Sequence, residues 1–274
     1  MDTTQITRDT VLCISLSGRP SNIGTRFHNF LYDELGLDFV YKAFTTTDLP
    51  AAVRGIRALG IRGAGVSMPF KEDVIALVDD MDPSALAIAS VNTIVNTDGH
   101  LRAYNTDYTA VATLLAEHGV PRDQELVVLG SGGMAKAVVA ALRDGGYGPG
   151  TVVARNRVSG TALAEQYGFD WRPDIGSLRP QLIVNATPVG MAGGPAAGDL
   201  PVPGEVVDAA QTVFEVVAMP QETPLVVRAR SGGARLITGS EVIALQAAEQ
   251  FALYTGVRPT AEQVARASAF SRAG

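Results

Sequence analysis

The sequence has very little of what stabilises small secreted or metal-bound proteins. It contains a single cysteine, Cys13, so an intrachain disulfide is excluded, and the apolar run around this residue suggests that it lies in a core. The three histidines, His28, His100 and His118, are too few and too widely spaced to indicate a metal cluster. We therefore expect no metal cofactor.

Positive charge and long apolar runs are also scarce. The 22 Lys and Arg residues are outnumbered by 28 Asp and Glu residues, which argues against a nucleic-acid surface because such surfaces depend on clustered cations. No run of about 18 apolar residues occurs, and residues 1–10 lack the basic and then apolar pattern of a signal peptide. The sequence thus predicts a cytoplasmic protein without nucleic-acid or membrane partners, present as a monomer or a homodimer.

What the sequence does contain is material for two packed cores, since it has 274 residues of which 46% are hydrophobic. Strands and helices alternate in its first part, which predicts an α/β domain with a mostly parallel sheet covered by helices. We expect strands at residues 11–17, 39–44 and 62–67 and helices at 24–35, 51–59 and 69–79. Asp98 and Gly99 predict a hairpin turn between strands at 91–96 and 101–104.

The alternation resumes in the second part of the chain as a Rossmann-like pattern. We expect helices at residues 106–119, 158–168 and 222–231 and strands at 126–129, 151–154, 182–185, 206–208, 213–217 and 235–238. Two final helices, 240–255 and 260–272, have no sheet of their own and should pack against the first domain. The expected domains are therefore residues 1–105 with 240–274, and residues 106–239.

A glycine cluster in residues 126–142 predicts a strand, a tight turn and a helix, in the pattern Gly-x-Gly-Gly-x-x-x-Ala. Glycines there allow positive φ and let backbone N–H groups approach a phosphate at a helix N-terminus. The pattern falls short of the full G-x-G-x-x-G fingerprint, so a turn that merely packs a helix on a sheet remains an alternative. The residues that would contact a dinucleotide are Gly130, Ser131, Gly132, Gly133, Met134 and Ala135.

A basic stretch, Arg155-Asn156-Arg157, follows the next predicted strand. At this place in a dinucleotide site an acidic residue binds a free ribose hydroxyl, whereas a basic residue suits a 2′-phosphate. A guanidinium that forks toward phosphate favours NADP over NAD. The alternative is a solvated basic turn at a strand end.

Two further stretches carry side chains suited to proton transfer. Lys71 follows Met68-Pro69-Phe70 at the end of a predicted strand, where α/β sheets present reactive groups. The same lysine could be an ordinary surface residue on a first helical turn, although the helix dipole disfavours a cation there. Asp107, in Tyr104-Asn105-Thr106-Asp107, is either a site residue or an acid at a helix N-terminus.

Together these stretches resemble the shikimate dehydrogenase family. Its motifs occur in the family's order over nearly the whole chain, at residues 67–71, 91–93, 105–107, 130–135, 185–191 and 223–225, and at Gly239 with Gln246 seven residues later. Residues 15–22 and 217–220 are most similar to the shikimate dehydrogenase-like subgroup. Each short motif is weak alone, but their joint order is specific.

The resemblance implies a substrate-binding domain followed by an NADP-binding domain, and reversible NADP(H)-dependent reduction of 3-dehydroshikimate to shikimate in aromatic amino-acid biosynthesis. It implies that Lys71 is the general acid and base, and that Asp107 binds the same substrate hydroxyl. Ring hydroxyls would contact Ser67, Asn92 and Gln246. The implied cofactor contacts, besides the glycine turn and Arg155, Asn156 and Arg157, are Asn185, Ala186, Thr187, Met191, Val216 and Gly239.

The departures from the family pattern fall on the substrate side. Asn22 and Gly24 occupy the places of two serines that bind the substrate carboxylate, and Ala218 replaces a pocket tyrosine. We hypothesise that Ser21 or Asn22 takes over the carboxylate, with Arg26 as a further candidate. A dehydrogenase for quinate or an aminoshikimate, a non-catalytic NADP-binding regulator, and a methylene-tetrahydrofolate dehydrogenase-type enzyme remain alternatives, of which residues 105–107 disfavour the last.

Overall fold

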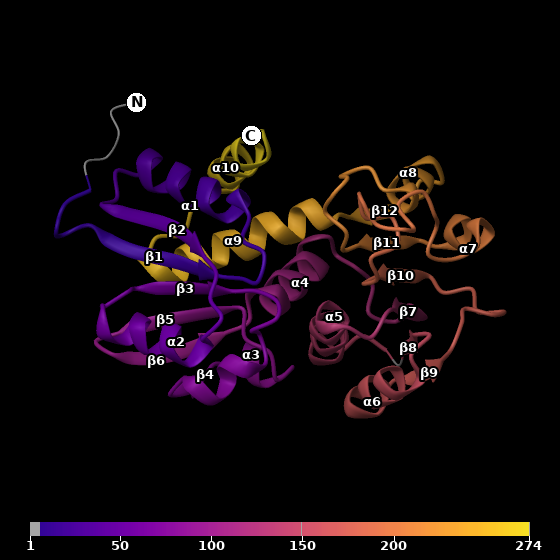
Figure 1. The fold of residues 1–274 in the computed structure, drawn as a ribbon. Helices are drawn as coiled ribbons and strands as arrows, with labels where there is room; N and C mark the ends of the chain where they lie inside the picture. Colours follow the sequence, from indigo (N-terminus) through magenta and orange to yellow (C-terminus); the bar gives the residue numbers. More distant parts are fainter. Residues whose placement is uncertain (1–5, 149, 274) are drawn as a thin grey trace. The chain divides into compact units, whose positions relative to one another are not determined.

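The computed structural model describes residues 6–148 and 150–273, and the chain divides into two compact units. Unit 1 comprises Met1–Thr106 with Ala244–Gly274, and unit 2 comprises Asp107–Ile243. Each unit is built on a six-stranded sheet (Figure 1). None of the helices within the described residues is both long and apolar enough to cross a lipid bilayer.

The sheet of unit 1 is mixed, and its strands have the order β2-β1-β3-β5-β6-β4. The strands are β1 (Val11–Leu16), β2 (Phe39–Phe44), β3 (Gly63–Val66), β4 (Asp80–Met81), β5 (Thr93–Thr97) and β6 (His100–Tyr104). Three of the five pairings are parallel, whereas β5 runs antiparallel to both β3 and β6. Asp98 and Gly99 turn the β5–β6 hairpin with φ of 52° and 88°, as their residue types predict.

The helices of unit 1 are α1 (Asn22–Glu34), α2 (Leu49–Ala58), α3 (Pro83–Leu86) and α10 (Ala261–Arg272), with most of α9 (Gly239–Thr255). Side chains fix their starts. The Asp48 carboxylate accepts a hydrogen bond from Ala51 N at 2.9 Å at the start of α2, and Thr260 forms a capping box with Gln263 at the start of α10. Helix α10 packs on α1, so the expectation that the last helices return to the first domain is confirmed.

The helix expected at residues 69–79 is wrong. Turns occupy this segment up to the short 3-10 helix η1 (Asp73–Leu77). The Lys71 carbonyl accepts a hydrogen bond from Val91 N at 2.8 Å, which is a partner outside the segment and replaces a helical one. Lys71 therefore does not lie on a first helical turn, and the helix-dipole argument about it no longer applies.

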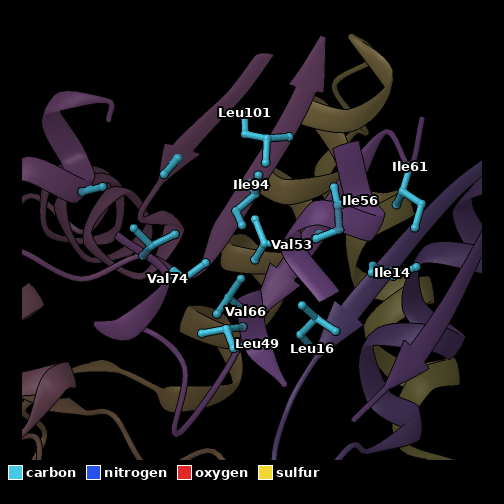
Figure 2. Packing of buried hydrophobic residues seen from close by; sticks show 14 residues of the cluster. Ile14, Leu16, Leu49, Val53, Ile56, Ile61, Val66, Val74, Ile94 and Leu101 are labelled. Carbon is cyan, nitrogen blue, oxygen red and sulfur yellow. The ribbon is translucent and has the colours of Figure 1, made fainter. Parts of the chain in front are cut away.

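Two apolar layers cover the sheet of unit 1. On one face the side chains of β1, β3, β5 and β6 pack against α2 and η1, and Figure 2 labels Leu16, Val53, Val66, Val74 and Ile94 among the residues of this layer. The other layer lies under α1 and α9 and includes aromatic rings and Cys13, which is fully buried as predicted. Burial raises the pKa of the Cys13 thiol to about 12, so it behaves as a small apolar residue.

The sheet of unit 2 is parallel throughout, with the order β12-β11-β10-β7-β8-β9. Its strands are β7 (Leu126–Leu129), β8 (Gly150–Val153), β9 (Asp170–Arg172), β10 (Leu182–Asn185), β11 (Thr212–Glu215) and β12 (Arg235–Ile237). Its helices are α4 (Thr106–Glu117), α5 (Gly133–Asp144), α6 (Arg157–Tyr167), α7 (Gly204–Ala209) and α8 (Pro224–Ser231). The chain winds outward from β7 to β9, returns to β10 beside β7, and winds outward the other way.

The strand expected at residues 206–208 is also wrong, because this segment is helix α7. Val206 and Val207 are buried against Val202, Leu225 and Ala229 in the core of unit 2. Adjacent β-branched residues favour a strand locally, but burial against α8 outweighs this weak preference. The short outer strand β9 was not predicted, since three residues carry too little periodicity.

Candidate functional site

The glycine turn lies at the topological switch point of the unit 2 sheet, between β7 and β10. Gly130 has φ of 110°, and a Cβ atom on it would lie 2.9 Å from the carbonyl oxygen of Ala186, so only glycine fits. Gly132 is the N-cap of α5 and offers no side chain to the first N–H groups of that helix. These N–H groups can therefore bind an anion such as a phosphate.

The basic stretch follows β8, the strand beside β7. The Asn156 side-chain oxygen Oδ1 accepts a hydrogen bond from Ser159 N at 3.2 Å and caps α6, while the Ser159 hydroxyl lies 2.8 Å from that of Ser131 in the glycine turn. The Arg157 guanidinium lies over the Trp171 ring, 5.8 Å from its centroid. Arg155 is exposed at the strand end. Arg155 and Arg157 are thus cations at the end of the strand beside the glycine turn.

On the other side of the switch point, the Asn185–Met191 loop follows β10. The Asn185 side chain is fully buried and shapes this loop: its oxygen accepts hydrogen bonds from Thr187 N and Oγ1 at 3.1 and 2.6 Å. Its Nδ2 donates to the Val189 carbonyl at 3.2 Å and to the Glu215 carboxylate at 2.9 Å. The Asn185 side chain thus fixes the backbone of this loop through hydrogen bonds. Ala186, Thr187, Met191 and Val216 are not fully buried and lie nearer the surface of this edge.

Sequence reasoning missed Glu215, the last residue of β11. Its carboxylate is fully buried, and burial raises its pKa to about 7 against hydrogen bonds that lower it. An acidic residue directly after the apolar run Val213-Phe214 is the feature that could have revealed it, because a buried acid needs several donors.

The predicted substrate residues of unit 1 gather where β1 and β3 end and β5 begins. Ser67 N donates to the Leu16 carbonyl at 2.9 Å, and Val66 N donates to the Asn92 carbonyl at 2.7 Å. Gly18 N donates to the Met68 carbonyl at 3.0 Å, which joins the loop after β1 to the loop that carries Lys71. The structure therefore brings Ser67 and Asn92 to neighbouring places at one sheet edge.

Asn92 carries a buried side-chain donor that no described residue accepts. Its side chain is 1% exposed, and its oxygen accepts hydrogen bonds from Thr93 Oγ1 and Thr106 N, both at 2.8 Å. Its Nδ2 has no hydrogen-bond partner within the described residues. Such an unpaired group costs about 1–3 kcal/mol. Asn92 is thus held in place by its oxygen while its Nδ2 remains able to bind an acceptor on a ligand.

Helix α9 contributes two glutamines to this edge. Gln250, which sequence reasoning missed, is buried and donates from Nε2 to the Asn92 carbonyl at 3.2 Å and to Thr93 Oγ1 at 2.9 Å. Gln246 lies one helical turn earlier and therefore on the same face of α9. The face of α9 that contacts the Asn92 backbone therefore carries both glutamines.

Lys71 and Asp107 occupy different units. Lys71 is half-buried in the turn after β3 in unit 1, and its backbone is held by the hydrogen bond from Val91 N. Asp107 is 5% exposed in the first turn of α4 and is the first residue of unit 2. Thr106, the residue before it, donates its N–H to the Asn92 side chain, so the segment that enters α4 is tied to the edge described above.

The start of α1 holds the candidates for a carboxylate. Ser21 is the N-cap, but its side chain makes no capping hydrogen bond, and Asn22 is exposed beside it. Arg26 is engaged elsewhere, since its Nε and Nη2 donate to the Phe270 carbonyl at 3.2 and 2.9 Å and its guanidinium lies over the Phe270 ring. Arg19, which sequence reasoning missed, is exposed, and its guanidinium makes no hydrogen bond or ion pair within the described residues.

Comparison with known proteins places these features in a family. The family model for the shikimate dehydrogenase substrate binding domain matches residues 22–94. A shikimate dehydrogenase-like protein of Haemophilus influenzae is 52% identical over 267 residues, which are 97% of this chain and 98% of that protein. The chain belongs to the shikimate dehydrogenase family. An NADP(+) shikimate dehydrogenase of Moorella thermoacetica is 36% identical over 261 residues, covering 89% of this chain and 88% of that protein.

Solved structures of the shikimate dehydrogenase family share the fold along nearly the whole chain. A shikimate 5-dehydrogenase-like protein matches with a TM-score of 0.96 at 52% identity, over 97% of this chain and 99% of that one. The Thermus thermophilus enzyme in complex with NADP(H) and shikimate matches with a TM-score of 0.85 at 29% identity, over 95% and 99%. A Corynebacterium glutamicum quinate dehydrogenase in complex with NAD matches with a TM-score of 0.85 at 26% identity, over 95% and 98%.

Proposed function

We propose that this protein is an NADP-dependent oxidoreductase that interconverts shikimate and 3-dehydroshikimate. The observation that supports this best is the buried, unpaired Nδ2 of Asn92 at the sheet edge that also carries Ser67 and the Lys71 loop. A polyhydroxylated ring supplies the hydroxyl oxygens that such a donor needs. The family relationship adds relatives that carry the same activity in their names, with NADP(+) as the cofactor.

The residues present fit a dinucleotide. Residues 106–239 would bind it, with the glycine turn at the pyrophosphate and Arg155 at a 2′-phosphate, and residues 1–105 with 240–274 would bind the ring. A guanidinium attracts a 2′-phosphate that an acidic residue would repel, so we favour NADP(H) over NAD. When bound, NADPH supplies the hydride; the protein must orient the ring and transfer one proton.

Lys71 would transfer that proton. During reduction its ammonium gives a proton to the carbonyl oxygen of the substrate as hydride reaches the carbonyl carbon, and during oxidation the neutral amine takes the proton back. Asp107 would accept a hydrogen bond from the same hydroxyl and orient the ammonium.

The carboxylate would lie at the start of α1. Ser21 and Asn22 supply side-chain donors there, and the exposed guanidinium of Arg19 adds charge from the loop that precedes the helix. Arg26 is a weaker candidate because two of its guanidinium N–H groups already bond the Phe270 carbonyl. We expect Asn22→Ala and Arg19→Gln to raise the KM for shikimate, and Arg26→Gln to leave it unchanged.

One activity panel tests the proposal. Shikimate, quinate and aminoshikimate are each assayed with NADP+ and NAD+, and we expect the highest kcat/KM for shikimate with NADP+. Quinate with NAD+ is the second candidate, since the chain resembles a quinate dehydrogenase that binds NAD and departs from the family at Asn22, Gly24 and Ala218. NADPH binding without turnover of any of the three rings would instead indicate a regulatory protein.

A further inference from the structure

Three buried polar side chains meet where β10 and β11 of unit 2 end. The Glu215 carboxylate accepts hydrogen bonds from Asn185 Nδ2 and Val217 N through Oε1, and from Thr223 Oγ1 through Oε2, all at 2.9 Å. Asn185, Glu215 and Thr223 are all fully buried. One carboxylate therefore joins the loop after β10, the segment after β11 and the start of α8.

Backbone contacts show how closely these three segments fit. Val216 N donates to the Asn185 carbonyl at 3.0 Å, and Ala192 N donates to the Met219 carbonyl at 2.8 Å. A Cβ atom on Gly190, which has φ of 90°, would lie 3.2 Å from Thr223 Cβ. A Cβ atom on Gly239 would lie 2.4 Å from the Val216 carbonyl oxygen. Small shifts in one segment would therefore displace the others, because close-packed interiors transmit strain.

The position of this cluster in the sheet indicates which part of a ligand it serves. In a doubly wound sheet a dinucleotide crosses the switch point, so its two halves lie on opposite sides of it. Arg155 and the glycine turn lie at β8 and β7, which assigns the adenosine half to that side. The nicotinamide half then belongs to the side of β10 and β11, where Ala186, Thr187, Met191 and Val216 lie over the buried cluster.

We propose that Glu215 is a positioning residue for the nicotinamide half of the cofactor: it holds the Asn185–Met191 loop and Val216 in the arrangement that this half requires. This role rests on the proposed function, because it presupposes a dinucleotide at this edge. Replacement by alanine leaves Asn185 Nδ2, Val217 N and the Thr223 hydroxyl without their common acceptor. Replacement by glutamine keeps an oxygen for the first two donors, and the Thr223 hydroxyl can rotate to accept from the new amide.

Binding of two probes to the full-length protein tests this role without catalysis. NADPH contacts both sides of the switch point, whereas 2′,5′-ADP carries only the adenosine half. We expect Glu215→Ala to raise the Kd for NADPH by about tenfold or more and to leave the Kd for 2′,5′-ADP within about twofold. Glu215→Asp keeps the carboxylate on a shorter side chain, so it should raise the Kd for NADPH by a smaller factor and leave the Kd for 2′,5′-ADP unchanged. This variant also tests the role if the alanine variant does not fold.

Two controls separate positioning from general support of the fold. Glu215→Gln should bind NADPH within about threefold of the wild type. Glu222 lies just before α8, and its exposed carboxylate pairs with Arg230. Glu222→Ala should change the Kd of neither probe. The role would be overturned if Glu215→Ala raised the Kd values of both probes equally or changed neither of them. It would also be overturned if Glu215→Gln bound NADPH as weakly as Glu215→Ala.

The outcome is distinguishable from failure of the proposed function. A wild-type protein that binds NADPH but does not oxidise shikimate refutes the assigned reaction and leaves the test of Glu215 intact. A wild-type protein that binds neither probe refutes the cofactor site and the role of Glu215 with it.

Discussion

At the carboxyl edge of the unit 2 sheet the buried side chains Asn185, Glu215 and Thr223 are bonded to one another, whereas at the edge of the unit 1 sheet Asn92 keeps a buried donor without a partner within the described residues. The first edge satisfies its polar groups internally and offers a ligand mainly backbone N–H groups and a shaped surface. The second edge offers side-chain hydrogen bonds. Substitutions at the two edges should therefore have different signatures.

The largest expected effect belongs to the unit 1 edge. Lys71→Ala should lower kcat for shikimate oxidation by roughly 10²–10⁴, because it removes the group proposed to transfer the proton. The Kd for NADPH should change by less than about twofold, since the proposed cofactor contacts lie in unit 2. Steady-state kinetics with NADPH titration measure both. Lys42→Ala, at an exposed lysine of β2, is the control and should leave kcat unchanged. Full turnover in Lys71→Ala would remove the assignment.

The next effect concerns the unpaired donor. Asn92→Asp keeps the acceptor of the Thr93 and Thr106 hydrogen bonds but loses Nδ2, so it should raise the KM for shikimate by about tenfold or more. The Asn96 amide instead bonds the Ile56 carbonyl and Gly99 N within the fold. Asn96→Asp should therefore lower Tm with little change in KM. If both variants affect KM equally, Asn92 has no special place in the substrate site.

At the unit 2 edge, we expect the charge of Arg155 to affect binding of the 2′-phosphate alone. Arg155→Ala should raise the KM for NADPH by about tenfold, because a charge-assisted contact to the 2′-phosphate is lost, and should leave the KM for NADH nearly unchanged. Arg179→Ala, at an exposed arginine in the loop before β10, is the matched control and should change neither KM. Equal changes for the two cofactors would contradict contact with the 2′-phosphate.

The buried carboxylate of unit 2 makes stability depend on pH. The pKa of Glu215 is raised by burial from 4.5 to about 7, so between these values the folded state binds a proton that the unfolded state has lost. Glu215 therefore contributes stability below about pH 4.5 and loses it as pH rises to 7, by up to roughly 3 kcal/mol. Thermal unfolding from pH 5 to 8 should show wild type losing Tm relative to Glu215→Gln. A constant difference across this range would contradict the raised pKa.

The buried imidazole of unit 1 should act in the opposite direction. His28 is fully buried and stacks on Tyr41 with ring centroids 4.4 Å apart, and burial lowers its pKa from 6.5 to about 3. Below pH 6.5 the unfolded state binds a proton that the folded state does not bind. The free energy of unfolding therefore falls as the pH falls toward 3. His28→Phe should flatten this acid limb by a few degrees in Tm between pH 7 and 5. If the Tm of His28→Phe falls with pH as steeply as that of the wild type, other groups cause the loss of stability in acid.

Much of the fold followed from local patterns in the sequence. The alternation of apolar strands and amphipathic helices, the Asp98-Gly99 hairpin and the glycine turn at Gly130 each depend on residues close together in the chain. The family motifs also identified Asn92 and Asn185, although not the different use that the structure makes of them. The Nδ2 of Asn92 has no partner within the described residues, whereas Asn185 uses its amide in hydrogen bonds to the Val189 carbonyl and to Glu215.

Tertiary contacts decided the rest. The segment after Pro69 forms turns and a 3-10 helix in place of an α-helix, and the Lys71 carbonyl accepts a hydrogen bond from Val91 N. Two guanidinium N–H groups of Arg26 bond the Phe270 carbonyl, which lies 244 residues further along the chain. The sequence does not show that Glu215 links three segments, because its donors, Asn185, Val217 and Thr223, meet only in the folded protein. The sequence by itself determined most of the helices and strands and which segments carry the candidate site residues. Hydrogen-bond partners distant in sequence decided which polar groups remain for ligands, because such pairs exist only after the strands and helices have packed.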